Sequence, residues 1–381
     1  PNGSDGAAGD ASHPWRTVGH VNGATLQPGD TVLFQGGATF ADATLMPAQS
    51  GSASAPITFG AFGTGKPNLS AGIWFSAKSH LTFDGLAVDA GSSPGDLSAI
   101  QASASGSGST AIAIENCAFT HVRIGVNSAN TGDAGWTIED TLIQDTRDSG
   151  AIVLGHDFTF RGNTILDTGQ DSSIAYGKHG VYAKGPSLTF VGNVIRRFSD
   201  DGISLRYHDA TVVGNTISDG PIGVGWFQQD TGSGGTTTIA YNRITGTTSS
   251  GIYVSPSDEG GSTRESFVIS DNTVKAASGN GADLSRTSGS LALANNVFTG
   301  AVSPTVRVYL PGGTYTEHND AFSSTSAAPQ IVLGASWLGL AADVRASGQG
   351  AGDTTAAPDL DSDLAPVSGS PLVDAGSSAV Q

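Results

Sequence analysis

Residues 177–208 read GKHGVYAKGPSLTFVGNVIRRFSDDGISLRYH and contain two copies of one short pattern. Each copy opens with a glycine that apolar residues follow at the first and third positions, as in Gly180-Val-Tyr-Ala-Lys184 and Gly202-Ile-Ser-Leu-Arg206. An alternating apolar stretch with an asparagine turn follows each, at 188–195 and 210–217. Alternation with a period of two is typical of half-buried β-strands. Two such copies, 22 residues apart, indicate successive coils of a solenoid.

The same pattern extends along most of the chain, which indicates a repeat architecture. An Asn or Asp follows an alternating stretch repeatedly, and from Asn116 onward the intervals are 22 to 30 residues. That spacing fits a parallel β-helix coil of three short strands and three turns. Asn tolerates left-handed backbone, and stacked side-chain amides can hydrogen-bond from coil to coil, so we expect a structural role for these residues. They are Asp84, Asn116, Asp140, Asn163, Asn193, Asn215, Asn242, Asn272, Asn296 and Asn319.

A column of glycines opens one strand in each predicted coil, at 125, 150, 180, 202, 223, 251 and 281. Residues one and three positions after each glycine are predicted to face inward, and those at two and four to face outward. This places Lys184 beside Arg206 and Tyr182 beside Ser204. Adjacent coils lie about 4.8 Å apart, close to the rise of a saccharide unit, so a sugar chain could follow this column. Loops at 169–177, 228–235 and 256–264 flank the sheet and predict a cleft.

Composition restricts the function further. The 381 residues carry a net charge of −17 with a pI near 4.5, which disfavours nucleic acid as a partner. No apolar run approaches the roughly 20 residues that span a bilayer. The single cysteine, Cys117, excludes an intrachain disulfide and is predicted to be a small buried residue. The chain opens with Pro-Asn-Gly-Ser, without an initiator methionine or signal peptide, so we expect a processed, secreted, extracellular monomer.

Two early phrases, Leu26–Phe34 and Gly51–Phe59, read as a turn followed by a strand. They resemble the lead-in of secreted right-handed parallel β-helix proteins of the pectate-lyase-like superfamily, and Gly369–Gly376 resembles a common ending of such proteins. The resemblance implies a carbohydrate-active protein related to polysaccharide lyases. We predict an all-β, single-stranded right-handed parallel β-helix of about ten coils. Residues 1–80 form the N-terminal capping segment, 81–325 the coils and 326–381 the C-terminal capping segment.

Positive charge gathers in the opening stretch. Five of the 17 Lys and Arg residues fall within 177–208, together with His179 and His208. In an acidic chain this excess predicts a site for an anionic, uronic-acid-containing polysaccharide. Cleavage by β-elimination needs a group that neutralises the carboxylate, a base and an acid. Arg206 offers a planar fork for the carboxylate and Lys184 is the candidate base, an arrangement that resembles lyases of this superfamily. Tyr182, His179, Tyr207 and His208 are candidate proton donors or alternative bases.

Glycoside hydrolysis by paired carboxylates is the alternative reaction. Asp200-Asp201 resembles the aspartate pair of polygalacturonase-type β-helix hydrolases, and Lys178-His179-Gly180 resembles their Gly-His-Gly motif. In that family the aspartate pair precedes the histidine, whereas here it follows. Asp171 and Asp230 in the flanking loops could complete a pair.

Three further alternatives stay open. A uronate C-5 epimerase would share the proton abstraction of the lyase. A carbohydrate-binding protein would use Phe227 and Tyr253 to stack on sugars. Lys184 and Arg206 could also be surface charges neutralised by Asp201 or Asp209.

The predicted catalytic residues are Lys184, Arg206, Tyr182, His179 and Asp201. The predicted substrate-binding residues are Lys178, Asp200, Tyr207, His208, Phe227, Asp230 and Tyr253. No metal ligand is predicted among them, and calcium is the one candidate cofactor. Asp359-x-Asp361-x-Asp363 could bind calcium, but the stretch lacks the glycine and glutamate of an EF-hand, so a solvated acidic loop is expected.

Overall fold

The computed structural model covers residues 1–381 and describes 3–372 except 92–94, 230–233, 256–264, 286–288, 301–304, 310–312, 325–330, 334–335, 339–350 and 357. The chain forms two compact units, Pro1–Thr189 and Phe190–Gln381. Among the described residues the only helix is the six-residue α1 (Val18–Gly23). No described helix has the length and apolar character needed to cross a membrane.

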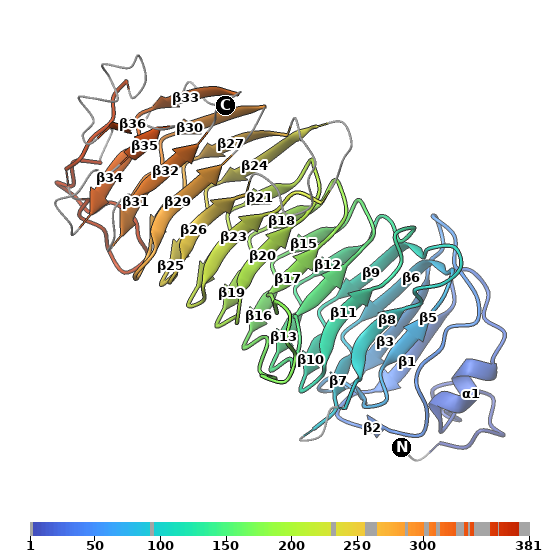
Figure 1. The fold of residues 1–381 in the computed structure, drawn as a ribbon. Coiled ribbons are helices and arrows are strands. Elements are labelled where there is room, and N and C mark those ends of the chain that lie inside the picture. The colour runs from blue at the N-terminus through green and yellow to red at the C-terminus, as the bar shows by residue number, and fades with distance from the viewer. Residues whose placement is uncertain are drawn as a thin grey trace. The chain divides into compact units, whose positions relative to one another are not determined.

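Three parallel sheets build the first unit, and each coil after the first contributes one strand to each sheet (Figure 1). The first sheet contains β1 (Thr31–Gln35), β3 (Ile57–Phe62), β6 (Ser79–Asp84), β9 (Thr110–Glu115), β12 (Thr137–Glu139) and β15 (Thr159–Arg161). The second contains β2 (Thr39–Phe40), β4 (Asn68–Leu69), β7 (Ala87–Asp89), β10 (Ala118–Thr120), β13 (Leu142–Gln144) and β16 (Thr164–Leu166). The third contains β5 (Ile73–Phe75), β8 (Ser98–Ala102), β11 (Ile124–Ser128), β14 (Ala151–Val153) and β17 (Val181–Ala183).

The second unit repeats this plan, and β18 (Thr189–Val191) contains the boundary between the units. Its first sheet contains β21 (Thr211–Val213), β24 (Thr236–Ala240), β27 (Ser266–Ser270), β30 (Ser290–Ala294) and β33 (Thr314–His318). Its second contains β19 (Val194–Arg196), β22 (Thr216–Ser218), β25 (Arg243–Thr245), β28 (Thr273–Lys275), β31 (Val297–Gly300) and β34 (Ala321–Ser324). Its third contains β20 (Asp201–Leu205), β23 (Ile222–Trp226), β26 (Ser250–Val254), β29 (Asn280–Ser285), β32 (Val306–Tyr309), β35 (Ile331–Leu333) and β36 (Ser336–Leu338).

The core of each unit lies between its three sheets, as the alternation predicts. Residues one and three positions after the column glycines, such as Val181, Ile203 and Ile252, are completely buried. The outward residues Tyr182 and Lys184 are half-buried. Strands this short hold only because every coil pairs in register with the next, so that inward residues stack on inward residues.

Parallel pairing starts ahead of the expected coil boundary at residue 81. Thr31 on β1 already pairs with Thr58 on β3, and Ile57 on β3 pairs with Leu81 on β6. Phe34 supplies core there. Beyond residue 325, β35 continues the third sheet in parallel with β32 and then pairs with the antiparallel β36. Parallel pairing therefore begins within the predicted N-terminal cap, whereas in the predicted C-terminal cap one parallel strand is followed by an antiparallel one.

The asparagine ladder is confirmed in the second unit. Asn193, Asn215, Asn242, Asn272 and Asn296 are buried, and each donates its side-chain amide to the side-chain oxygen of the next residue in the ladder, at 2.8–3.0 Å. Each ladder residue therefore joins two coils through a hydrogen bond that solvent does not reach.

For Asn116, Asp140 and Asn319 the expected left-handed backbone is confirmed, but their expected place in the ladder is wrong by one position. Asn116, Asp140 and Asn319 adopt left-handed turns with φ of 50°, 46° and 56°. The residue that follows each of them occupies the ladder instead. Thr141, for example, accepts the backbone N–H of Cys117 at 3.2 Å and donates its own N–H to Asn163 at 3.1 Å.

Candidate functional site

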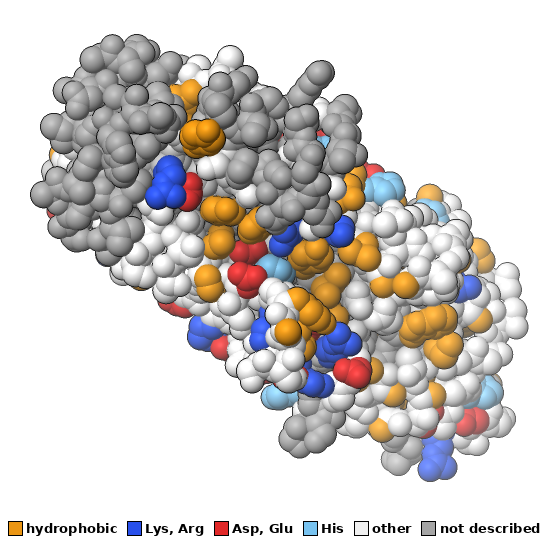
Figure 2. All heavy atoms as spheres, viewed as in Figure 1, with side chains coloured by type: hydrophobic (Ala, Val, Ile, Leu, Met, Phe, Trp, Pro, Cys, Tyr) orange, Lys and Arg blue, Asp and Glu red, His pale blue; other side chains and the backbone are white. Residues whose placement is uncertain are grey.

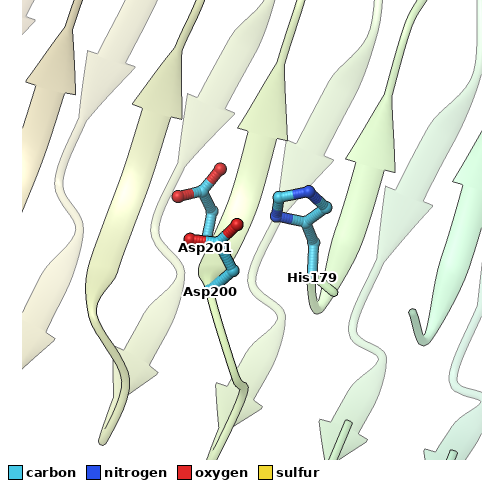
Figure 3. Close-up of side chains that lie close together, drawn as sticks. All are labelled: His179, Asp200 and Asp201. Atoms are coloured by element: carbon cyan, nitrogen blue, oxygen red, sulfur yellow. The ribbon is translucent and has the colours of Figure 1, made fainter. Parts of the chain in front are cut away.

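Asp200 and Asp201 stand where the chain enters β20 (Figure 3). Asp201 is 1% exposed, whereas Asp200 is half-buried. A carboxylate oxygen of one lies within 4.8 Å of a carboxylate oxygen of the other. The backbone is fixed by the next coil, because Ile222 pairs with Asp201 and donates its N–H to the carbonyl of Asp200 at 3.1 Å. The strand therefore holds two carboxylates close together in different degrees of exposure.

Gly225 on β23 makes room for the groups that lie beside Asp201. A Cβ at this position would come within 2.6 Å of the Phe227 ring and 3.3 Å of the Asp201 carboxyl carbon. The Phe227 ring and the Asp201 carboxyl group thus both lie close to Gly225. Any larger residue at this position would displace neighbouring atoms. This close approach brings an aromatic face next to the carboxylate pair.

Arg206 and Tyr253 extend this surface. The Arg206 guanidinium carbon lies 4.1 Å from the centre of the Phe227 ring, and the Phe227 and Tyr253 ring centres are 5.3 Å apart. All three side chains are half-buried. A guanidinium on an aromatic face is held by cation–π attraction. We call Phe227, Tyr253 and Arg206 the cationic platform.

Two predicted binding residues lie at the other end of β20. His208 Nδ1 is 2.7 Å from Asp209 Oδ2, and the Tyr207 carbonyl accepts the indole N–H of Trp226 at 3.0 Å. The pKa of Asp209 is lowered, chiefly because its carboxylate accepts the backbone N–H of Thr236. Asp209 therefore pairs with His208, and the predicted roles of Tyr207 and His208 in substrate binding stay predictions.

In the first unit, His179 and Tyr182 come together as the chain enters β17. Their rings stack with centres 5.3 Å apart and planes 19° apart. His179 is 3% exposed, and its backbone N–H donates to Ser149 Oγ at 3.1 Å. Lys184 follows the strand, with its backbone N–H bonded to the Val153 carbonyl at 2.7 Å. The stack fixes the imidazole against the phenol ring, so both proposed proton-transfer groups have defined positions.

The loop that leads into β17 is held by contacts that the sequence did not predict. Arg123 Nη2 lies 3.5 Å from Asp148 Oδ2 and donates to the Tyr176 hydroxyl at 3.1 Å, and Tyr176 in turn donates to Asp148 at 3.3 Å. Lys178 donates its amine to the Asp171 carbonyl at 2.6 Å. Lys178 thus holds the loop, and its predicted contact with substrate stays a prediction.

The Asp171 carboxylate belongs to the same loop. It accepts Ser173 Oγ at 2.6 Å, and it forms an ion pair with Arg147. The hydrogen bond from Ser173, followed by Arg147, lowers the pKa of Asp171 far below its usual value. Asp171 is therefore committed to an ion pair within its own unit. Its predicted role as one of two catalytic carboxylates stays a prediction.

Three expectations fall beyond what the structure describes. Asp230 and the loop 256–264 lie outside the described residues. The sequence predicted that Lys184 lies beside Arg206 and that Tyr182 lies beside Ser204. Each pair consists of residues from different units, so both statements stay predictions. On the face shown in Figure 2, charged side chains stand in small groups among uncharged ones, in keeping with the 13% of charged residues.

The comparisons with known proteins concern the fold. A family model described as "Right handed beta helix region" matches residues 167–322. No curated protein matches the chain.

Three solved structures are similar to the chain at low identity. The catalytic unit of a GH87 α-1,3-glucanase from Streptomyces thermodiastaticus is 19% identical with a TM-score of 0.57, and covers 80% of this chain and 60% of its own. A GH136 lacto-N-biosidase from Eubacterium ramulus is 14% identical with a TM-score of 0.52, and the match covers 86% of this chain and 64% of the biosidase chain. A periplasmic alginate epimerase is 12% identical with a TM-score of 0.50, and the match covers 82% of this chain and 77% of the epimerase chain.

The chain thus spans less than two thirds of the glucanase and biosidase chains that it matches. The family model agrees with the handedness that the resemblance implied, and the stacked parallel coils agree with the repeat that the ladder predicted. The matches confirm the expected resemblance to pectate-lyase-like β-helix proteins: the chain folds as a right-handed parallel β-helix.

Proposed function

We propose that this chain is a secreted carbohydrate-active enzyme that hydrolyses an acidic polysaccharide. The observation that carries the proposal is the pair of carboxylates at the start of β20, beside the cationic platform. Hydrolysis of a glycosidic bond uses one carboxyl group as acid and a second carboxylate as base or nucleophile. Asp200 and Asp201 supply both groups from one rigid strand.

The two aspartates differ in access, which suggests their roles. Asp201 is buried and, like the Phe227 ring, lies close to Gly225, so we assign to it the proton that the leaving oxygen receives. Asp200 is half-buried and its carboxylate lies within 4.8 Å of that of Asp201, too close for a water between them, so we assign to it the attack on the sugar carbon, after which water releases the sugar from the carboxylate.

The cationic platform supports an acidic sugar as substrate. Phe227 and Tyr253 offer faces on which a pyranose ring stacks, and Arg206 offers a fork for a uronate carboxylate. The three compared structures are named as a glucanase, a lacto-N-biosidase and an alginate epimerase. Carbohydrate is therefore the substrate class that both the local chemistry and the similarity of fold favour.

A second candidate reaction is β-elimination on the same substrate. Arg206 favours it, because a cation that neutralises the uronate carboxylate also stabilises the carbanion formed beside that carboxylate. The sequence-based candidates for the base and for the acid, Lys184 and Tyr182 or His179, belong to the first unit and stay predictions. A C-5 epimerase would return the proton to the opposite face instead.

A substrate panel tests the proposal. The protein is incubated with alginate, pectate, glucuronan and neutral glycans, and each reaction is followed by reducing ends and by ultraviolet absorbance of unsaturated products. The proposal predicts reducing ends from one polyuronate without absorbance. Absorbance would establish the lyase, activity only on neutral glycans would remove the acidic substrate, and inactivity on all of them would favour an epimerase or a binding protein.

A further inference from the structure

The asparagine ladder of the second unit depends on amide groups that donate and accept in a fixed pattern. Both the backbone N–H and the side-chain amide of Asn242 donate to Asn272 Oδ1, at 3.0 and 2.9 Å. The same amide also donates to the Val212 carbonyl at 2.8 Å. Asn215, Asn272 and Asn296 share this pattern with Asn242: the amide nitrogen lies between two acceptors and the oxygen opposite two donors.

Asp320 continues this ladder with a carboxylate. Its Oδ1 accepts the backbone N–H and the side-chain amide of Asn296 at 2.6 and 2.9 Å, as an asparagine would. Its own N–H donates to Asp353 Oδ1 at 2.9 Å. The other carboxylate oxygen of Asp320, Oδ2, takes the place of the amide nitrogen that donates in the asparagines of the ladder. Asp320 is completely buried, and among the described residues its Oδ2 has no hydrogen-bond partner.

Two further carboxylates surround this position. Glu317 on β33 is 3% exposed and Asp353 is 7% exposed. One carboxylate oxygen from each of Glu317, Asp320 and Asp353 lies within 4.8 Å of the other two. The Tyr315 hydroxyl donates to Glu317 Oε2 at 2.6 Å. Three acidic groups therefore converge in a buried space.

Such a cluster is costly without a compensating positive charge. Glu317, Asp320 and Asp353 are all buried, and their carboxylates lie close enough for their negative charges to repel one another. Buried carboxylates that repel one another are stable when they share protons or coordinate a cation.

We propose that Glu317, Asp320 and Asp353 bind one calcium-like divalent cation in the second unit. Hard cations of this class take carboxylate oxygens at about 2.3–2.6 Å, so oxygens on opposite sides of the ion lie at most about 5 Å apart, which the cluster satisfies. Asp320 Oδ2 then gains a partner, and the ion replaces the amide donors at the end of the ladder.

The proposed ion is structural. Glu317 belongs to β33, in a different sheet from the β20 strand that carries Asp200 and Asp201. The ion would tie together residues of β33, the turn before β34 and the segment around Asp353. The exposed loop at Asp361 is a poorer calcium site, because Asp361 Oδ1 already accepts the backbone N–H groups of Asp363 and Ala365, at 2.8 and 2.9 Å.

Calcium binding and thermal unfolding of the full chain test this site. After chelator treatment, the protein is titrated with calcium or magnesium chloride, and bound metal is measured by equilibrium dialysis. We expect one calcium per chain and a rise in Tm on the order of 5 °C at saturation. Asp320→Asn restores an amide to the ladder, so we expect this variant to bind calcium at least about tenfold more weakly and to lose the calcium-dependent rise in Tm.

Two further variants keep the test decisive. Glu317→Gln removes a ligand without changing side-chain shape and should also weaken binding, which covers the case in which Asp320→Asn does not fold. Asp363→Asn changes an exposed carboxylate and should leave binding unchanged. Absence of stoichiometric calcium binding to the unchanged protein would overturn the site. So would calcium binding that persists in both Asp320→Asn and Glu317→Gln, or that disappears in Asp363→Asn.

Discussion

The guanidinium carbon of Arg206 lies 4.1 Å from the centre of the Phe227 ring, so a cation is held flat against an aromatic face. Arg206 follows β20 and Phe227 follows β23, the next strand of the same sheet. Stacking of coils therefore creates this contact between residues that are 21 positions apart in the sequence. The arrangement presents one charge and one apolar face together, as an acidic sugar ring requires.

Replacing Arg206 with alanine should lower kcat/KM on the polyuronate substrate by roughly 10- to 100-fold, because a hydrogen-bonded ion pair with the substrate is lost. Activity assays and thermal unfolding of the same preparation check this, with Tm expected to change little. Arg243→Ala is the matched control, since Arg243 is an exposed arginine on β25 of the same unit. Normal activity of Arg206→Ala would remove this residue from the site.

Replacing Asp201 with asparagine should reduce kcat by about 10²- to 10⁴-fold, because the side chain keeps its shape but can no longer donate a proton to the leaving oxygen. Substrate binding, measured by calorimetry with an oligouronate, should persist. Asp200→Asn should produce a comparable loss. If only one of the two variants lost activity, the paired-carboxylate mechanism would fail.

Replacing Asn242 with alanine should lower the free energy of unfolding by about 3 kcal/mol. The change removes the donor for the Val212 carbonyl and the acceptor that Asn215 uses for its N–H and its amide, and all of these groups are buried. Urea unfolding measures the loss. Arg243→Ala, an exposed change on the same coil, should alter the free energy by less than about 0.5 kcal/mol. Equal effects of the two changes would show that the ladder contributes nothing to stability.

The single thiol should be inert in the folded protein. Burial raises the pKa of Cys117 to about 12 from its ordinary value of 9.0. A thiol reagent at pH 8 should therefore react only after unfolding in urea. In the unfolded chain the thiol ionises near its ordinary pKa, whereas the folded chain keeps the proton. Its contribution to stability is thus present below pH 9 and is lost as pH rises towards 12. Rapid labelling of folded protein would contradict this.

The period of two in the sequence was enough to predict the coils and the inward faces, because residues such as Val181 and Ile203 alternate with polar neighbours. The sequence did not show which residue belongs to the ladder where two polar residues are adjacent. In Asn319-Asp320 both residues suit a left-handed turn and both suit a buried polar column, so the pattern alone did not show that Asp320 is the buried one.

The candidate site was predictable in part. The sequence indicated Arg206, Phe227 and Tyr253 because they follow the column glycines at regular positions. It gave no sign of the contact between Arg123 and Tyr176, which are 53 residues apart and meet through an irregular loop. The closeness of Glu317 to Asp353 was equally hidden, because no repeat aligns the two positions.

Mass spectrometry of the cleavage products tests the central claim most directly. Hydrolysis adds one water for each bond broken, whereas elimination leaves an unsaturated sugar and adds none. Our account predicts saturated oligouronates with one added water per cleavage, formed at least about 100-fold more slowly by Asp201→Asn. Unsaturated oligouronates without that water, produced equally well by Asp201→Asn, would contradict it.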